Sequence, residues 1–115
     1  MFASLISVGR VHRGVEFDQR IAAQLVDDYG IPDGMTAEAY LLWIGNRRLW
    51  LERLGVRAEQ HILDHLTLMS VCGAGIVDHD DYRSVMTRPF LSQEEKAVRL
   101  RRRFLPTDSY EAPHE

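Results

Sequence analysis

The sequence predicts an all-α protein, a compact single-domain bundle of about five helices. Apolar residues recur at helical spacing, as in the series Phe17, Ile21, Leu25 and Tyr29, which places one apolar stripe on one face of a helix. No segment shows the convincing alternation of apolar and polar residues that predicts a β-strand. The chain has 115 residues, a length typical of one domain.

The predicted helical domain occupies residues 15–104 and is flanked by two segments without a predicted helix. Residues 1–14 are expected to form an irregular N-terminal lead or a short edge strand, because Gly9 and Gly14 interrupt them and nothing fixes their structure. Residues 105–115, LPTDSYEAPHE, have the composition of a disordered tail. We therefore expect the hydrophobic core to come from the central residues.

The first two predicted helices are bounded by residues that start and stop helices. The first covers residues 15–29 and ends before Gly30, a common helix terminator. Thr36 can cap the second helix, which ends before Gly55. Gly45 lies in the middle of the second helix, where glycine costs about 1 kcal/mol relative to alanine. We expect the close approach of a neighbouring helix to explain it.

The second predicted helix is apolar on two sides. Projection at about 100° per residue gives one wide apolar face, formed by Tyr40, Trp43, Ile44, Trp50, Leu51 and Leu54. Leu42 and Leu49 form a smaller stripe on the opposite side. A helix that is apolar on two sides is usually central in its bundle, and we expect that position here.

The third helix is predicted over residues 57–72 and carries the residues most suggestive of chemistry. His61 and His65 lie on one face, and Cys72 falls near the same face. Histidine and thiol are metal-ligand types, but no HExxH or CxxC spacing accompanies them. Burial of the cysteine and partial burial of both histidines in the core is the favoured interpretation. We expect no catalytic residue, no metal site, no cofactor and no enzymatic activity.

Two shorter helices complete the predicted bundle. Asp78 is expected to cap the fourth helix, which must end before Pro89 because the residue preceding a proline is pushed out of the α region. Ser92 and Glu95 form a capping box for the last helix, predicted over residues 93–104.

Charge is distributed unevenly, although the net charge is only -3. Residues 15–40 contain six acids and one arginine, whereas residues 88–104 contain six basic residues and two acids. The acidic balance of the whole chain argues against nucleic-acid binding. The two poles suit pairing within the chain or binding of a protein partner. The candidate partner-binding residues on these poles are Asp27, Asp28, Arg99, Arg102 and Arg103.

Three residues of the second helix are further candidates for partner binding. Arg47 projects into the wide apolar face, where an unpaired charge would be costly. We expect it to meet backbone carbonyls or a carboxylate, with Asp64 or an acid of the first helix as possible partners; alternatively, a partner protein covers it. Trp43 and Trp50 lie seven residues apart on the same stripe. Core packing is their default interpretation, and anchoring a partner is the alternative.

Neither a signal peptide nor a membrane span is expected. Residues 2–8 are mildly apolar, but they contain Ser4 and Ser7 and follow no basic residue. No apolar run approaches the roughly 18 residues that a transmembrane helix needs. The single cysteine, Cys72, excludes a disulfide within the chain and fits a reducing compartment. We therefore expect a cytoplasmic protein that does not bind a membrane.

The order of these features resembles a known family. After the acidic first helix comes LLWIGNRRLWLERLGV, an apolar helix with a leucine-glycine-aliphatic end. It is followed by EQHILDHLTLMSVCGAGIVDHDDY, a helix with a late methionine, then glycine and an acidic cluster, and by the closing helix LSQEEKAVRLRRRF. Over residues 17–104 this pattern resembles small helical proteins encoded beside type VI secretion spike and effector genes in bacteria. The chain departs from the family pattern at Arg57, where serine or threonine is usual, and at Asp81, where proline is frequent.

The resemblance implies a protein-protein role and no catalytic residues. Members of that family occur alone or fused behind adaptor-chaperone domains that load toxic effectors onto the spike. The resemblance thus implies a co-chaperone or adaptor accessory that binds a secretion effector or its adaptor chaperone. The alternative is an immunity or regulatory protein that neutralises a partner by binding it. A homodimer also stays open.

Overall fold

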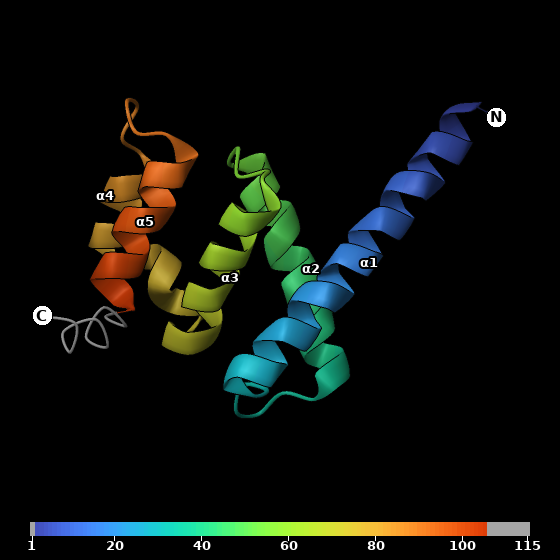
Figure 1. Ribbon diagram of the computed structural model, residues 1–115, viewed down its shortest axis with the longest axis horizontal. Helices are drawn as coiled ribbons and strands as arrows, with labels where there is room; N and C mark the ends of the chain where they lie inside the picture. The colour runs from blue at the N-terminus through green and yellow to red at the C-terminus, as the bar shows by residue number, and fades with distance from the viewer. Residues whose placement is uncertain (1, 106–115) are drawn as a thin grey trace, which may run out of the picture. The chain divides into compact units, whose positions relative to one another are not determined.

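The computed structural model describes the backbone of residues 2–105 and the side chains of residues 14–105 (Figure 1). Its elements are α1 (Phe2–Tyr29), α2 (Ala37–Arg53), α3 (Glu59–Cys72), the 3-10 helix η1 (Ala74–Asp78), α4 (Asp80–Met86) and α5 (Gln93–Phe104). The described residues contain no strand. The predicted all-α class with five α-helices is confirmed.

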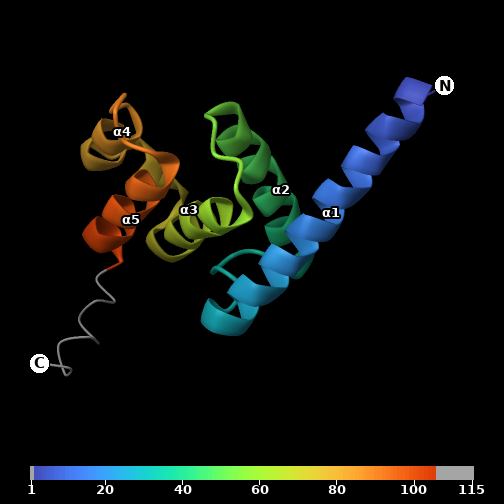
Figure 2. The same cartoon turned by 45° about the horizontal axis from the view of Figure 1, so that its top comes forward.

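The chain divides into two compact units, Met1–Arg53 and Leu54–Glu115. In the first unit α1 packs against α2, and the two helices lie side by side in both views (Figures 1 and 2). In the second unit α3 and α4 both pack against α5, and η1 contacts α3 and α4. That the two units together form one domain over residues 15–104 stays a prediction.

α1 begins much earlier than predicted. It starts at Phe2, so the prediction of an irregular lead or edge strand over residues 1–14 is wrong for residues 2–14. Gly9 and Gly14 lie inside the helix instead of ending it. A glycine in a helix interior costs only about 1 kcal/mol relative to alanine, and no proline precedes Pro32. Glycine alone therefore did not stop this helix.

Side chains from both helices form the core of the first unit. Its buried apolar residues are Phe17, Ile21, Leu25, Tyr40, Ile44 and Leu51. The predicted stripe of α1 is confirmed except at its end, because Tyr29 is 53% exposed. Leu42 and Leu49 on the other side of α2 are 71% and 48% exposed. The expectation that both sides of α2 are covered, as in a central helix, is therefore wrong.

The start of α2 confirms the cap predicted for it. The backbone N–H of Ala39 donates to Thr36 Oγ1 at 3.0 Å, which satisfies one of the unpaired amides of the first turn. Gly55 follows the helix with a φ of 92°, the left-handed conformation that favours glycine.

α1 and α2 approach closely at Gly45 and at Gly14. A Cβ atom at Gly45 would lie 2.9 Å from Asp18 Oδ2, and one at Gly14 would lie 2.9 Å from Arg48 Nη2. Asp18 and Arg48 pair with each other across the two helices. Each glycine thus leaves room for one partner of an ion pair, which confirms the expected close approach at Gly45.

Gly45→Ala is expected to lower the free energy of unfolding by about 1 to 2 kcal/mol. Alanine is the better helix former, but its methyl group would push against the Asp18 carboxylate that Arg48 holds, and such overpacking costs about 1 to 3 kcal/mol. Urea unfolding measures the change. Gly75→Ala is the matched control, because nothing lies within 4 Å of its Cβ position. Equal stability of the two variants would contradict the prediction.

The core of the second unit is built on α3. Its buried apolar residues are Val56, Ile62, Leu66, Leu68, Met69, Tyr82, Ala97, Leu100 and Leu105. Leu105 is the C-cap residue of α5, so the predicted disordered tail over 105–115 is wrong at this residue. The rest of that tail, residues 106–115, lies outside the described residues.

The two caps predicted in the second unit have different outcomes. The capping box of α5 is confirmed, since Glu95 N–H donates to Ser92 Oγ at 3.0 Å and Ser92 N–H donates to Glu95 Oε1 at 3.3 Å. The prediction that Asp78 caps α4 is wrong, because Asp78 ends η1 and His79 takes the cap position. The His79 ring Nδ1 accepts a hydrogen bond from Asp81 N–H at 3.0 Å.

Candidate functional site

An open depression of about 390 Å³ lies on the second unit and is lined mainly by arginine. The lining residues are Asp81, Ser84, Val85, Arg88, Arg99, Arg102 and Arg103. We refer to this set as the arginine depression. Arg99, Arg102 and Arg103 project from one face of α5 because they are three and four residues apart. Arg88 follows α4, directly before the proline that ends that helix.

One arginine of the depression is paired. Arg103 Nε donates to Asp81 Oδ2 at 2.7 Å, and the guanidinium lies 5.0 Å from the centre of the Phe104 ring. Both members of this ion pair are about half exposed, so the pair contributes little to stability. It does show that a carboxylate can be held at this end of the depression.

The other three arginines carry charge that the described part of the chain leaves unmatched. Arg88, Arg99 and Arg102 are exposed, and no described acid forms an ion pair with them. A guanidinium forks onto carboxylate or phosphate oxygens with two parallel hydrogen bonds. The depression therefore presents guanidinium groups of a kind that pairs with anionic groups.

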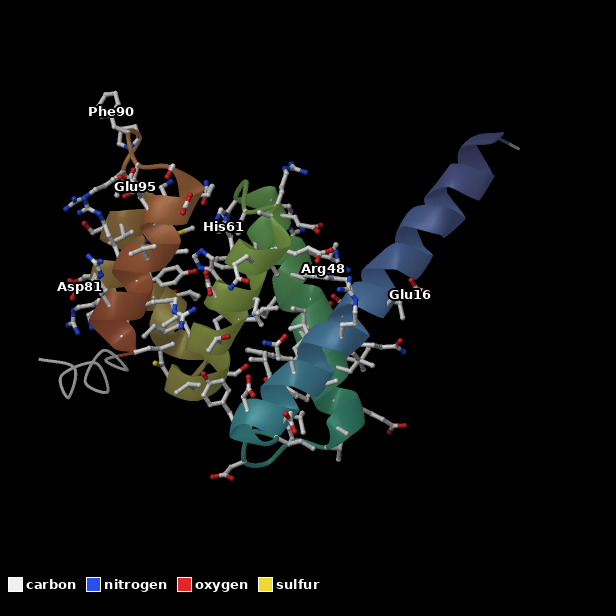
Figure 3. All side chains as sticks on the ribbon, viewed as in Figure 1. Glu16, Arg48, His61, Asp81, Phe90 and Glu95 are labelled. Carbon is white, nitrogen blue, oxygen red and sulfur yellow. The ribbon has the colours of Figure 1, made fainter. Side chains whose placement is uncertain are left out.

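Phe90 is an exposed aromatic residue in the loop that follows Arg88 of the depression. Its side chain is 96% exposed and lies in the loop between α4 and α5, two residues after Arg88. Figure 3 shows Phe90 at the loop end of this helix pair, with Asp81 toward the opposite end. Sequence reasoning missed Phe90. The signal was its place between Pro89 and the cap Ser92, which excludes it from every helical stripe.

The structure gathers some of the predicted binding residues and leaves others elsewhere. Arg99, Arg102 and Arg103 line one depression. Asp27 and Asp28 are exposed in the last turn of α1, in the other unit. The remaining candidates, Trp43, Arg47 and Trp50, lie on α2.

The half-buried side chains of α2 stack on one another. The Arg47 guanidinium lies 5.8 Å from the centre of the Trp50 ring, a cation-π distance. The Trp43 ring stacks on Tyr40 at 5.8 Å between centroids. Arg47, Trp43 and Trp50 thus have ring contacts within the first unit, and their binding of a partner protein stays a prediction.

The prediction that Arg47 pairs with an acid of the first helix is wrong, because the adjacent Arg48 makes this pair. Arg48 donates from Nε to Asp18 Oδ1 at 2.5 Å and from Nη2 to Asp18 Oδ2 at 3.2 Å. The hydrogen bond to Asp18 raises the pKa of Arg48, as expected for a cation beside a carboxylate. Asp64, the other expected partner of Arg47, instead accepts from Arg101 at 2.7 Å. Both pairs are structural.

His65 is a core residue, as predicted. It is fully buried, and its Nδ1 lies 2.8 Å from the Tyr82 hydroxyl oxygen. Burial lowers the pKa of His65 to about 4, against a smaller opposing effect of the neighbouring Asp64 carboxylate. The ring is therefore neutral at pH 7.

Cys72 is exposed, so the prediction that it is buried is wrong. It is the last residue of α3, where the chain leaves the helix at Gly73. Its Sγ donates to the Phe104 carbonyl at 3.5 Å, and partial burial raises the pKa of the thiol. A raised pKa makes a thiol a poorer nucleophile at neutral pH. Within residues 14–105 no three metal-ligating side chains lie together.

Comparisons with known proteins return no match: no family model, curated protein or solved structure proves similar to the chain. The resemblance to the type VI secretion family therefore stays a prediction based on the sequence pattern of residues 17–104. Among the described helices, none is both long enough and apolar enough to cross a bilayer.

Proposed function

We propose that this chain is a non-catalytic accessory protein that acts by binding a partner protein. The observation that carries the proposal is the juxtaposition of three arginines without described partners and a 96% exposed phenylalanine in the adjoining loop. Arginine and aromatic residues are enriched in protein interfaces and supply most of their hot spots. The depression supplies groups that hold an anion, and its single carboxylate is already paired with Arg103.

The partner that we propose is a type VI secretion effector or its adaptor chaperone, in the bacterial cytoplasm. This step rests on the resemblance of residues 17–104 to the small helical family encoded beside spike and effector genes. A co-chaperone or adaptor accessory needs a binding surface and no chemistry. The arginine depression with Phe90 supports such a role.

Co-expression with an adaptor chaperone and an effector encoded beside the gene for this chain tests the proposal. We expect the chain to co-purify with one of them, and its deletion to lower the effector level in cells. The variant Phe90→Ala should reduce the recovered complex, and Leu42→Ala, which also removes an exposed apolar side chain, is its control. Failure to recover either neighbour, together with an unchanged effector level after deletion, would overturn the proposal.

The alternative is an immunity or regulatory protein that neutralises a basic partner, and one observation favours it. Asp27 and Asp28 occupy the last turn of α1 and are exposed. Acids there oppose the helix dipole, so helix stability does not explain them. Asp33 and Glu38 are further exposed acids of the same unit. This function predicts that the chain rescues cells from the cognate toxin without affecting secretion, and that D27N/D28N abolishes rescue.

A further inference from the structure

We infer that the arginine depression binds a short acidic peptide segment of the partner protein, with Phe90 contacting an apolar side chain next to the acidic residues. The inference rests on the proposed partner-binding function and adds the chemistry of the bound segment. It is carried by the arrangement of the arginines, by the charge around them, and by the apolar residues beside them.

The arginines of the depression come from two segments and are spaced along α5. Arg99 and Arg103 are one helical turn apart on α5, a rise of about 6 Å at 1.5 Å per residue. Arg88 contributes from a different segment, at the end of α4. Four arginines also carry more positive charge than one carboxylate neutralises. Several carboxylates carried on one chain match this charge better.

The charge around the depression favours a short segment over a long polyanion. The described residues of the second unit contain eight basic and seven acidic side chains, so the positive charge is local. Glu94 and Glu95 lie in the first turn of α5, the helix that bears Arg99, Arg102 and Arg103. A nucleic acid needs an extended basic surface for its phosphates and would meet these carboxylates. A peptide with a few acids avoids them.

The apolar neighbours of the arginines favour a peptide over a simple anion. Val85 lies among the lining residues, and Phe90 is exposed in the loop that follows Arg88. An exposed phenylalanine in a free protein gains most from burial against an apolar side chain. The surface thus matches a segment in which acidic and apolar residues alternate.

The Asp81–Arg103 ion pair indicates how the acidic segment competes for the depression. Asp81 already occupies Arg103 at 2.7 Å, but both side chains are about half exposed, so a carboxylate of the partner can replace Asp81 with little loss of stability. Asp81→Asn removes this competitor. We expect it to bind the acidic peptide several-fold more tightly.

Fluorescence anisotropy with defined probes tests the inference on the full chain. The probe is a labelled peptide of alternating glutamate and leucine, and its comparison is the glutamine-leucine isostere. We expect binding of the glutamate peptide to be at least about tenfold tighter, a difference of about 1.4 kcal/mol, and to weaken as salt is raised. Inorganic phosphate and a single-stranded oligonucleotide should compete poorly.

Two double variants separate the depression from general charge effects. R99Q/R102Q should weaken peptide binding by at least about tenfold, whereas R57Q/R83Q, which removes two exposed arginines outside the depression, should leave it unchanged. All four side chains are exposed, and circular dichroism verifies that each variant folds. Phe90→Ala should weaken binding of the glutamate-leucine peptide more than that of a glutamate-serine peptide.

Three results would overturn the inference. The first is an equal loss of peptide binding in the two double variants, and the second is tighter binding of the oligonucleotide than of the peptide. The third is a homodimer of the chain that dissociates on R99Q/R102Q substitution, because the depression would then bind a second copy. The proposed function fails separately. If a neighbouring protein co-purifies equally well with R99Q/R102Q and with the parent, the function stands and this inference is wrong. If the peptide binds as described but neither neighbour co-purifies, the inference stands and the proposed partners are wrong.

Discussion

Replacing Asp18 by alanine is expected to lower the free energy of unfolding by about 3 kcal/mol. The side chains of Arg48 and Asp18 are only 13% and 9% exposed, and Arg48 donates to both carboxylate oxygens. Without Asp18 the mostly buried guanidinium keeps Glu52, at 3.2 Å, as its remaining described partner. Such a loss reflects an uncompensated buried charge more than the net strength of the pair. Urea unfolding at pH 7 measures it.

Glu52→Ala is the matched control for this prediction. It removes a second carboxylate from the same guanidinium, but Glu52 is 34% exposed, and we expect a loss of less than about 1 kcal/mol. The double variant D18A/R48M should recover part of the stability lost in D18A, because it removes the buried guanidinium and leaves only the Glu52 carboxylate, which is 34% exposed, without its partner. If D18A costs no more than E52A, the pair does not hold α1 against α2.

Helix ends could be predicted wherever one local interaction decides them. Thr36 caps α2 and the Ser92–Glu95 box caps α5, because each needs a hydrogen bond to an amide at most three residues away. Where several neighbouring residues can cap, the prediction was wrong, as at Asp78 and His79. The start of α1 was missed because Gly9 and Gly14 weaken a helix without ending it.

The buried ion pair shows a different limit of sequence reasoning. An acid of the first helix was expected to pair with an arginine of the second, and it does, but through Arg48 instead of Arg47. The two arginines are adjacent, about 100° apart around the helix. Which one reaches α1 depends on how the helices cross, and a helical projection does not contain that angle. Gly45 indicated the close approach but not its partner.

The candidate site was predicted in part. Arg99, Arg102 and Arg103 were named from the charge of the last helix, and they line the depression. Arg88 lines the same depression from the end of α4. Phe90 is exposed in the loop that follows it. Helical periodicity places residues on helix faces only. It therefore assigns no position to a loop residue, and the contribution of these two could not be predicted in this way.

Acidification from pH 6.5 to pH 4 is expected to destabilise the protein by up to about 3 kcal/mol through His65 alone. Burial lowers the pKa of this ring from 6.5 to about 4, and one pKa unit corresponds to about 1.4 kcal/mol. The unfolded chain binds the proton first, so the stabilisation is complete above pH 6.5 and is lost as the pH falls toward 4.

The charged groups around His65 set the size of this effect but do not reverse it. Asp64 raises the pKa of the ring, whereas His61 and Lys96 lower it, and desolvation is larger than any of these effects. His65 Nε2 is buried without a hydrogen-bond partner among the described residues. Protonation would therefore place an uncompensated charge in the core.

Urea unfolding between pH 7 and pH 4.5 tests the prediction in the parent and in His65→Leu. The leucine variant loses the contact with Tyr82 and can be less stable at pH 7, but its stability should fall less steeply between pH 6.5 and pH 4.5. His61→Gln is the control, because His61 lies one turn away on the same helix and is only half-buried. It should keep most of the pH dependence of the parent, because desolvation lowers the pKa of His65 more than His61 does. An equally steep fall in His65→Leu would assign the acid sensitivity to other groups.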